Sequence, residues 1–117
     1  MTKKTVLEKK VKKGISKLVT SIWPTAYEFM PVQTGFGKTG VPDHLFCVPV
    51  VITQEMVGQT YGMFVGEEAK RFKEKPTPGQ YRNLAEITCA GGFAGYTAGL
   101  EALPRLEERL KRRFYLR

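Results

Sequence analysis

The stretch that decides the fold class covers residues 60–98 and reads TYGMFVGEEAK, RFKEKP, TPGQYRNLAEITCAGG, FAGYTA. Residues 60–70 and 93–98 are rich in apolar and aromatic residues and predict two strands. Between them we expect a helix with Thr77 as its N-cap and Pro78 as its first residue, ended by a glycine pair. A strand–helix–strand order favours parallel pairing of the two strands and therefore predicts an α/β fold.

The N-terminal segment, residues 5–22, has the periodicity of an amphipathic helix. Apolar residues recur there at steps of three or four, with lysines on the other face: Leu7, Val11, Ile15, Leu18 and Ile22. Thr5 and Glu8 have the spacing of a capping box, so the helix is expected to begin at Thr5. Trp23-Pro24 is expected to end it.

A hairpin is expected in the middle of the chain. Residues 26–40 contain a proline and several glycines and predict an irregular loop. Residues 44–53 are apolar and β-branched and predict a strand, in which Pro49 indicates an edge or a bulge. A turn over 54–59 then leads to the strand at 60–70, and the two strands are expected to pair antiparallel.

The C-terminal segment, about 103–117, predicts a helix entered at Pro104 with a basic exposed side. The order of elements is then α-β-β-α-β-α, with a small mixed sheet flanked by helices. The chain has 117 residues, of which 42% are hydrophobic and 11% aromatic, as in a globular domain. We expect a single domain, residues 1–117, with its core at about 5–98.

The formal net charge of +8 suits a polyanionic partner, either nucleic acid or an anionic membrane surface. A run of about 18 apolar residues, as a membrane span needs, is not present. No apolar block follows the basic N-terminus, so a signal peptide is not expected. Cys47 and Cys89 lie in apolar surroundings without metal-ligand spacing, which predicts buried, reduced thiols in a cytoplasmic protein.

Three charged residues of the predicted hairpin have the composition of a hydrolytic metal site. Asp43 follows Gly40-Val41-Pro42 and precedes the first strand; Glu68 and Lys70 lie two apart in the second and project from one face. Antiparallel pairing would bring Asp43 and Glu68 together. Two carboxylates suit Mg²⁺ or Mn²⁺, and an ammonium beside them can orient water and offset phosphate charge. His44 should face away from Asp43, and we expect it to be a packing or surface residue rather than a ligand.

Five elements in order resemble the VRR-NUC domains, in their small stand-alone phage form. These domains are a branch of the PD-(D/E)xK restriction-endonuclease-like nucleases. The matching residues are an early helical glutamate, a Pro-Asp before a strand, a Glu-x-Lys strand, a Thr-Pro-x-Gln helix start and a glycine pair before a last strand: Glu8, Gly40-Val41-Pro42-Asp43, Glu68-Ala69-Lys70, Thr77-Pro78-Gly79-Gln80 and Gly91-Gly92-Phe93. The resemblance covers about residues 5–98 and implies an α-β-β-α-β core.

The resemblance implies a Mg²⁺- or Mn²⁺-dependent DNA endonuclease that leaves a 5′-phosphate and a 3′-hydroxyl. The implied catalytic residues are Glu8, Asp43, Glu68, Lys70 and Gln80. The implied metal ligands are Asp43, Glu68, the Ala69 backbone carbonyl and Glu8. Lys70 would handle the nucleophilic water, and Gln80 would lie in the cleft.

Stand-alone members are similar to Holliday-junction resolvases, which implies branched DNA as the substrate and a phage-encoded protein in a bacterial host cell. A homodimer would present two sites to a four-way junction. Apolar side chains expected to be exposed before the site favour such a dimer: Trp23, Phe29, Met30 and Phe36.

Each candidate also has a structural interpretation. Glu8 would complete a helix cap, and Asp43 would be a turn residue. Glu67, Glu68 and Lys70 would form a solvated strand end. Gln80 would serve the start of its helix. The joint occurrence of these residues in the order of the family favours the site.

Basic residues gather in the first helix, after Lys70 and in the last helix. We expect contacts to the DNA backbone, with steeply salt-sensitive affinity, from Lys9, Lys12, Lys13, Lys38, Arg71, Lys73, Arg109, Arg112 and Arg113. Two other functions fit the charge. One is a non-catalytic basic DNA-binding module, and the other is a structural or interaction protein whose terminal helices contact RNA or an acidic partner.

Overall fold

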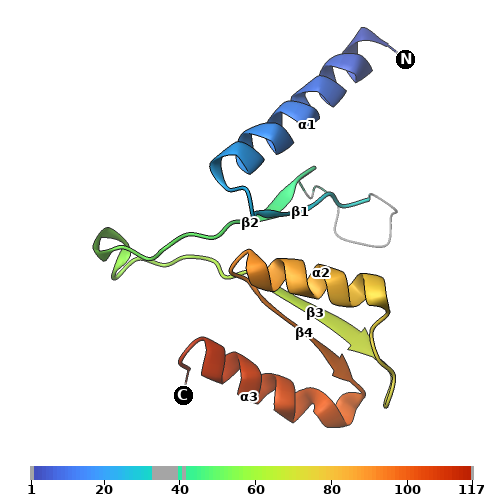
Figure 1. Ribbon diagram of the computed structural model, residues 1–117, viewed down its shortest axis with the longest axis vertical. Coiled ribbons are helices and arrows are strands. Elements are labelled where there is room, and N and C mark those ends of the chain that lie inside the picture. Colours follow the sequence, from blue (N-terminus) through green and yellow to red (C-terminus); the bar gives the residue numbers. More distant parts are fainter. Residues whose placement is uncertain (1, 33–39, 41, 117) are drawn as a thin grey trace. The chain divides into compact units, whose positions relative to one another are not determined.

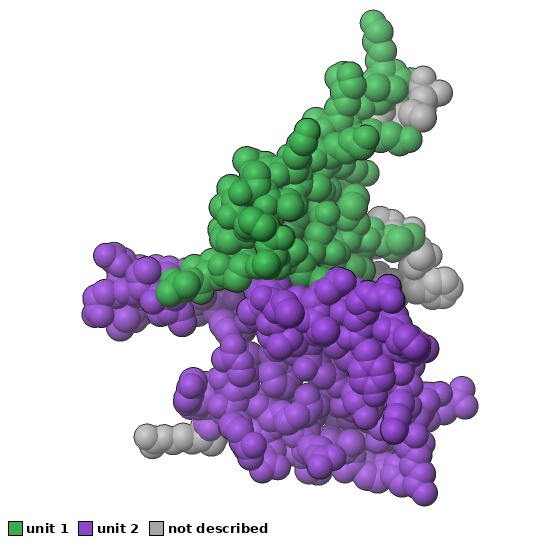
Figure 2. Space-filling model, in the orientation of Figure 1, with its two compact units in different colours: residues 1–51 green, residues 52–117 purple. Residues whose placement is uncertain are grey.

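The computed structural model describes residues 2–32, 40 and 42–116 (Figure 1). The described residues form three α-helices and four short strands, which confirms the expected mixed α/β class. The strands form two separate two-stranded sheets. The chain divides into two compact units, residues 1–51 (unit 1) and 52–117 (unit 2), coloured separately in Figure 2.

In unit 1, helix α1 (Lys3–Ile22) has the predicted amphipathic periodicity and ends before Trp23-Pro24, as predicted. It begins earlier than expected, because the Val6 amide donates to the Thr2 carbonyl at 3.2 Å and closes the first turn there. Thr5 therefore lies inside the helix, and the predicted capping box at this position is wrong.

A short antiparallel ladder follows α1 in unit 1. Strand β1 (Tyr27–Phe29) pairs with β2 (Leu45–Cys47), with Glu28 opposite Phe46. The prediction of an irregular segment over 26–40 missed β1, and the strand predicted at 44–53 is only three residues long in the structure. Prolines at positions 31 and 49 lie just beyond the two ends of the ladder, where they have no amide hydrogen to donate.

The predicted hairpin between residues 44–53 and 60–70 is wrong. Among the described strands, β2 pairs with β1, and β3 pairs with β4. The turn predicted over 54–59 does contain a 3₁₀ segment, Gln54–Met56, followed by Gly58 with a φ of 85°, but residues 48–53 before it and 60–64 after it form no strand. Pro49, which lacks an amide hydrogen, works against a continuous ladder in the first of the two predicted strands.

Unit 2 has the strand–helix–strand order that its sequence predicts. Strand β3 (Val65–Lys70), helix α2 (Pro78–Cys89) and strand β4 (Phe93–Ala98) follow one another, and β3 and β4 pair parallel over six residue pairs. Thr77 caps α2, with Pro78 at its first turn, as predicted. The connection through α2 therefore confirms the predicted parallel pairing.

The sheet of unit 2 lies between two helices (Figure 1). On one face, Gly66 lets α2 approach closely, since a Cβ at this position would lie 2.8 Å from Cδ1 of Ile87. On the other face lies α3 (Leu103–Arg113), which follows a 3₁₀ segment, Leu100–Ala102. Helix α3 ends four residues before the predicted limit of 117.

The two cysteines have different environments. Cys47 is buried in unit 1, as predicted, whereas Cys89 is exposed at the end of α2. Ile87 of α2 and Ala90, which directly follows the helix, are buried, whereas Cys89 between them lies off the buried face. In the part of the chain that the structure describes, no helix combines the length and apolar character of a membrane span.

Helix α3 is attached to the sheet by a partly buried ion pair. Arg109 Nη2 donates to Glu67 Oε2 at 2.8 Å, and the guanidinium lies 5.5 Å from the centroid of the Phe93 ring. Thr97 Oγ1 donates to the same carboxylate oxygen at 2.6 Å. Arg112, by contrast, makes an exposed pair with Glu108 on the helix surface.

We predict that Arg109→Ala lowers the free energy of unfolding of the chain by about 1–3 kcal/mol, because it leaves the Glu67 carboxylate partly buried without its cation. The matched change Arg112→Ala should cost less than about 0.5 kcal/mol, because its pair is solvated. Urea unfolding followed by circular dichroism measures both values. Equal losses for the two variants would contradict the assigned role of Arg109.

Candidate active site

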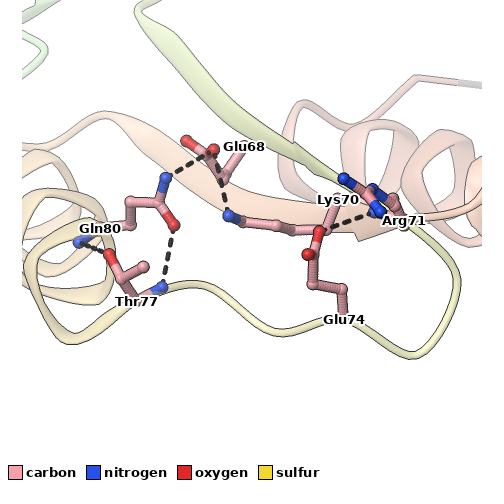
Figure 3. Close-up of polar contacts among 6 residues, drawn as sticks. All are labelled: Glu68, Lys70, Arg71, Glu74, Thr77 and Gln80. Atoms are coloured by element: carbon pink, nitrogen blue, oxygen red, sulfur yellow. Dashed lines mark hydrogen bonds and ion pairs between the residues drawn. The ribbon is translucent and has the colours of Figure 1, made fainter.

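The end of strand β3 carries a cluster of three polar side chains (Figure 3). Glu68 and Lys70 project from the same face, as their spacing predicts, and Lys70 Nζ lies 3.9 Å from Glu68 Oε1. The Lys70 side chain is 13% exposed and that of Glu68 is 33% exposed. The carboxylate of a half-buried glutamate therefore lies beside a lysine whose side chain is largely buried.

Gln80 joins this pair to the start of α2. Its Nε2 donates to Glu68 Oε1 at 3.0 Å, while its Oε1 accepts from the Thr77 amide at 2.9 Å. The Gln80 amide in turn donates to Thr77 Oγ1 at 3.2 Å, which completes a capping box. Because the box holds the side-chain oxygen, the NH₂ group is directed at Glu68.

The structure confirms the helix-start interpretation of Gln80, whereas its catalytic role stays a prediction. The residue serves the helix start, and it also contacts the candidate carboxylate. The ion pair with Lys70 and the hydrogen bond from Gln80 both use Glu68 Oε1. Among the described residues, Glu68 Oε2 has no ion pair or hydrogen bond. A carboxylate oxygen without such a partner is suited to bind a hard cation such as Mg²⁺.

The connector after Lys70 forms a tight turn. The Glu74 amide donates to the Arg71 carbonyl at 2.9 Å, and the Arg71 amide donates to Glu74 Oε1 at 3.1 Å (Figure 3). Lys73 occupies the left-handed region, with φ of 65°. Arg71 and Lys73, two of the predicted DNA contacts, are therefore exposed at the end of the strand that bears Glu68.

The neighbouring Glu67 points to the opposite face of β3, where it holds Arg109 and Thr97. Arg109 was predicted to contact DNA, but its guanidinium is engaged within unit 2. Sequence reasoning did not assign a partner to Glu67. The alternation of side chains along a strand separates it from Glu68, but the sequence does not reveal that α3 supplies the cation.

The other two residues implied as catalytic, Asp43 and Glu8, lie in unit 1. Asp43 is exposed at a bend before β2, and Glu8 is exposed on α1. Since the predicted hairpin is absent, the expectation that Asp43 lies beside Glu68 now rests on the family resemblance. The remaining predicted DNA contacts divide as follows: Lys9, Lys13, Arg112 and Arg113 are exposed, Lys12 is half-buried, and Lys38 lies outside the described residues.

A polar cluster that the sequence analysis missed connects α1 with the β1–β2 ladder. Glu28 Oε2 accepts from Ser16 Oγ and pairs with His44 Nδ1, each at 2.7 Å. His44 is only 6% exposed and stacks on Phe46, so its predicted packing role is confirmed. The hydrogen bond from Ser16, followed by the contact with His44, lowers the pKa of Glu28, against the opposing effect of burial.

Within the described ranges, no three His, Cys, Asp or Glu side chains gather in a group that could hold a metal ion. Ala69, whose carbonyl is the other implied ligand, is an exposed residue of β3. Comparisons with protein-family models, curated proteins and solved structures give no match for this chain.

We predict that Ser16→Ala raises the pKa of Glu28 toward the ordinary glutamate value of 4.5, because it removes the largest cause of the lowering. In the parent protein, the lowered pKa contributes stability above pH 4.5, and this contribution is lost as the pH falls through the folded-state pKa. Carbon-13 NMR titration of the Glu28 carboxyl group measures the shift.

Ser21→Ala is the matched control, since the Ser21 hydroxyl donates to the Leu18 carbonyl on the same helix. It should leave the titration of Glu28 unchanged. An identical Glu28 titration in the parent protein and in Ser16→Ala would contradict the assignment of the Ser16 bond as the main cause.

Proposed function

We propose that the chain is a Mg²⁺- or Mn²⁺-dependent DNA endonuclease of the VRR-NUC type, with the restriction-endonuclease-like core which that family implies. The observation that supports this most directly is the placement of Lys70 and the Gln80 amide around one oxygen of Glu68. These are three of the five residues that the resemblance implies as catalytic. They come from two elements, β3 and the start of α2, in the expected order.

The donor set fits a hard divalent cation. Glu68 would be one ligand through Oε2, the Ala69 carbonyl would be a second, and Asp43 enters as a further carboxylate from the sequence pattern. Glu8, exposed on α1, is the implied additional ligand. When bound, Mg²⁺ or Mn²⁺ would lower the pKa of a coordinated water and offset charge on the phosphate.

The protein's own groups have separable tasks in hydrolysis. The Gln80 amide holds Glu68 Oε1 in place, so that the carboxylate presents its other oxygen in one orientation. The Lys70 ammonium orients the attacking water and stabilises negative charge on the phosphorus centre. Water oxygen bonds to phosphorus, the bond from phosphorus to the 3′ oxygen breaks, and a proton of the water ends on that oxygen.

The charge and the basic residues support DNA as the partner. Arg71 and Lys73 are exposed immediately after Lys70, so phosphates near the cluster would meet two further cations. Branched DNA and a homodimer belong to the same proposal. Phe29 and Met30, two of the apolar residues that favour a dimer, are exposed in unit 1, Trp23 is half-buried, and Phe36 lies outside the described residues.

We predict that the purified chain cleaves a labelled four-way junction in Mg²⁺ or Mn²⁺ and that EDTA abolishes cleavage. Asp43→Asn, Glu68→Gln and Lys70→Ala should each lower the single-turnover rate by about a hundredfold or more, because each removes a group that stabilises the transition state. Gel electrophoresis of the products under single-turnover conditions measures the rates, and a linear duplex of matched sequence tests selectivity for branches.

Glu86→Gln is the control, because Glu86 is an exposed carboxylate on α2 outside the cluster. It should cleave at the parental rate. Cleavage that persists in EDTA, or full activity of Asp43→Asn, would refute the metal site. Tight DNA binding without any cleavage would favour the non-catalytic binding module.

A further inference from the structure

Phe72 is an exposed aromatic side chain directly after the candidate catalytic strand. It lies two residues beyond Lys70, between the cations Arg71 and Lys73, and 61% of its surface is accessible to solvent. A phenylalanine this exposed contributes little to the core of unit 2. Its apolar surface is therefore available to a ligand.

Hydrogen bonds close the turn that carries Phe72. Backbone and side-chain bonds between Arg71 and Glu74 close it on both sides, at 2.9 and 3.1 Å. Lys73 keeps a left-handed φ of 65°, which a lysine adopts only where the surrounding structure requires it. Pro76, which is buried, fixes the other end of the connector. The ring is thus presented from a hydrogen-bonded turn.

The charges around the ring complement nucleic acid. The Lys73 ammonium lies 5.4 Å from the centroid of the Phe72 ring, a cation–π contact that supports the ring from one side. Arg71 and Lys73 flank Phe72 in the sequence and are exposed, so they can bind phosphates next to the ring. An unpaired or unstacked base uses both features, since it can stack on the Phe72 ring while its phosphates meet the cations.

We propose that Phe72 is a wedge that enters an open base step of DNA, at a nick or branch point, next to the phosphate that Glu68 and Lys70 address. Apolar side chains inserted between base pairs must break stacking, which costs a few kcal/mol per step in an intact duplex. At a nick or branch much of that stacking is already weakened. The wedge would therefore select interrupted DNA over continuous duplex. Its position beside a scissile bond rests on the proposed nuclease function.

The test measures DNA affinity in EDTA, so that it does not depend on cleavage. Fluorescence anisotropy compares a continuous duplex with a nicked duplex of the same sequence. The parent chain should prefer the nicked duplex by about tenfold, a typical value for one base–aromatic stack. Phe72→Ala should lose most of this preference by weakening binding to the nicked duplex alone, and Phe72→Trp should keep it.

Tyr115→Ala is the matched control, because Tyr115 is an aromatic residue, 92% exposed, that follows arginines at the other end of unit 2. It should leave the preference unchanged. Equal binding of the two duplexes by the parent chain, or equal weakening of both by Phe72→Ala, would overturn the wedge. A Phe72-dependent preference for the nicked duplex in a chain that cleaves no DNA would support the wedge and refute the nuclease. Cleavage of DNA without that preference would support the nuclease and refute the wedge.

Discussion

The parallel pairing of β3 with β4 is the constraint on which the candidate site depends. Parallel neighbours cannot be joined by a tight turn, so the chain must leave the end of β3, cross one face of the sheet as α2, and return to the start of β4. The connector and the first turn of α2 therefore lie at the end of β3 that carries Lys70. This crossover is what places Gln80 against Glu68.

The two faces of the sheet separate two adjacent glutamates with different tasks. Glu67 holds Arg109 of α3 and so attaches the last helix. Glu68 faces α2, where it meets Lys70 and Gln80. A shift of β3 by one residue in its pairing with β4 would exchange these two environments, because side chains alternate between the faces along a strand. The attachment of α3 and the proposed chemistry thus depend on the same alignment of β3.

The sequence predicted unit 2 better than unit 1, for physical reasons. The Thr77-Pro78 helix start and the parallel crossover follow from local rules, and both are confirmed. The hairpin prediction is wrong because strand pairing depends on contacts between residues far apart in sequence. The apolar content of residues 44–53 does not reveal whether the strand that pairs with them comes before or after them in the chain. The Glu28 cluster was missed for a similar reason, since Ser16 and His44 are far apart in sequence and neither has a local motif.

The central claim is that Glu68, supported by Gln80, binds a divalent metal ion. The most direct measurement is a titration of the nitrogen-15-labelled chain with Mn²⁺, followed by NMR of the Gln80 side-chain amide. We predict that sub-stoichiometric Mn²⁺ broadens this signal and the backbone amides around Glu68, and that Glu68→Gln abolishes the effect. An unaffected Gln80 signal in the parent chain, at Mn²⁺ in excess over protein, would contradict the claim.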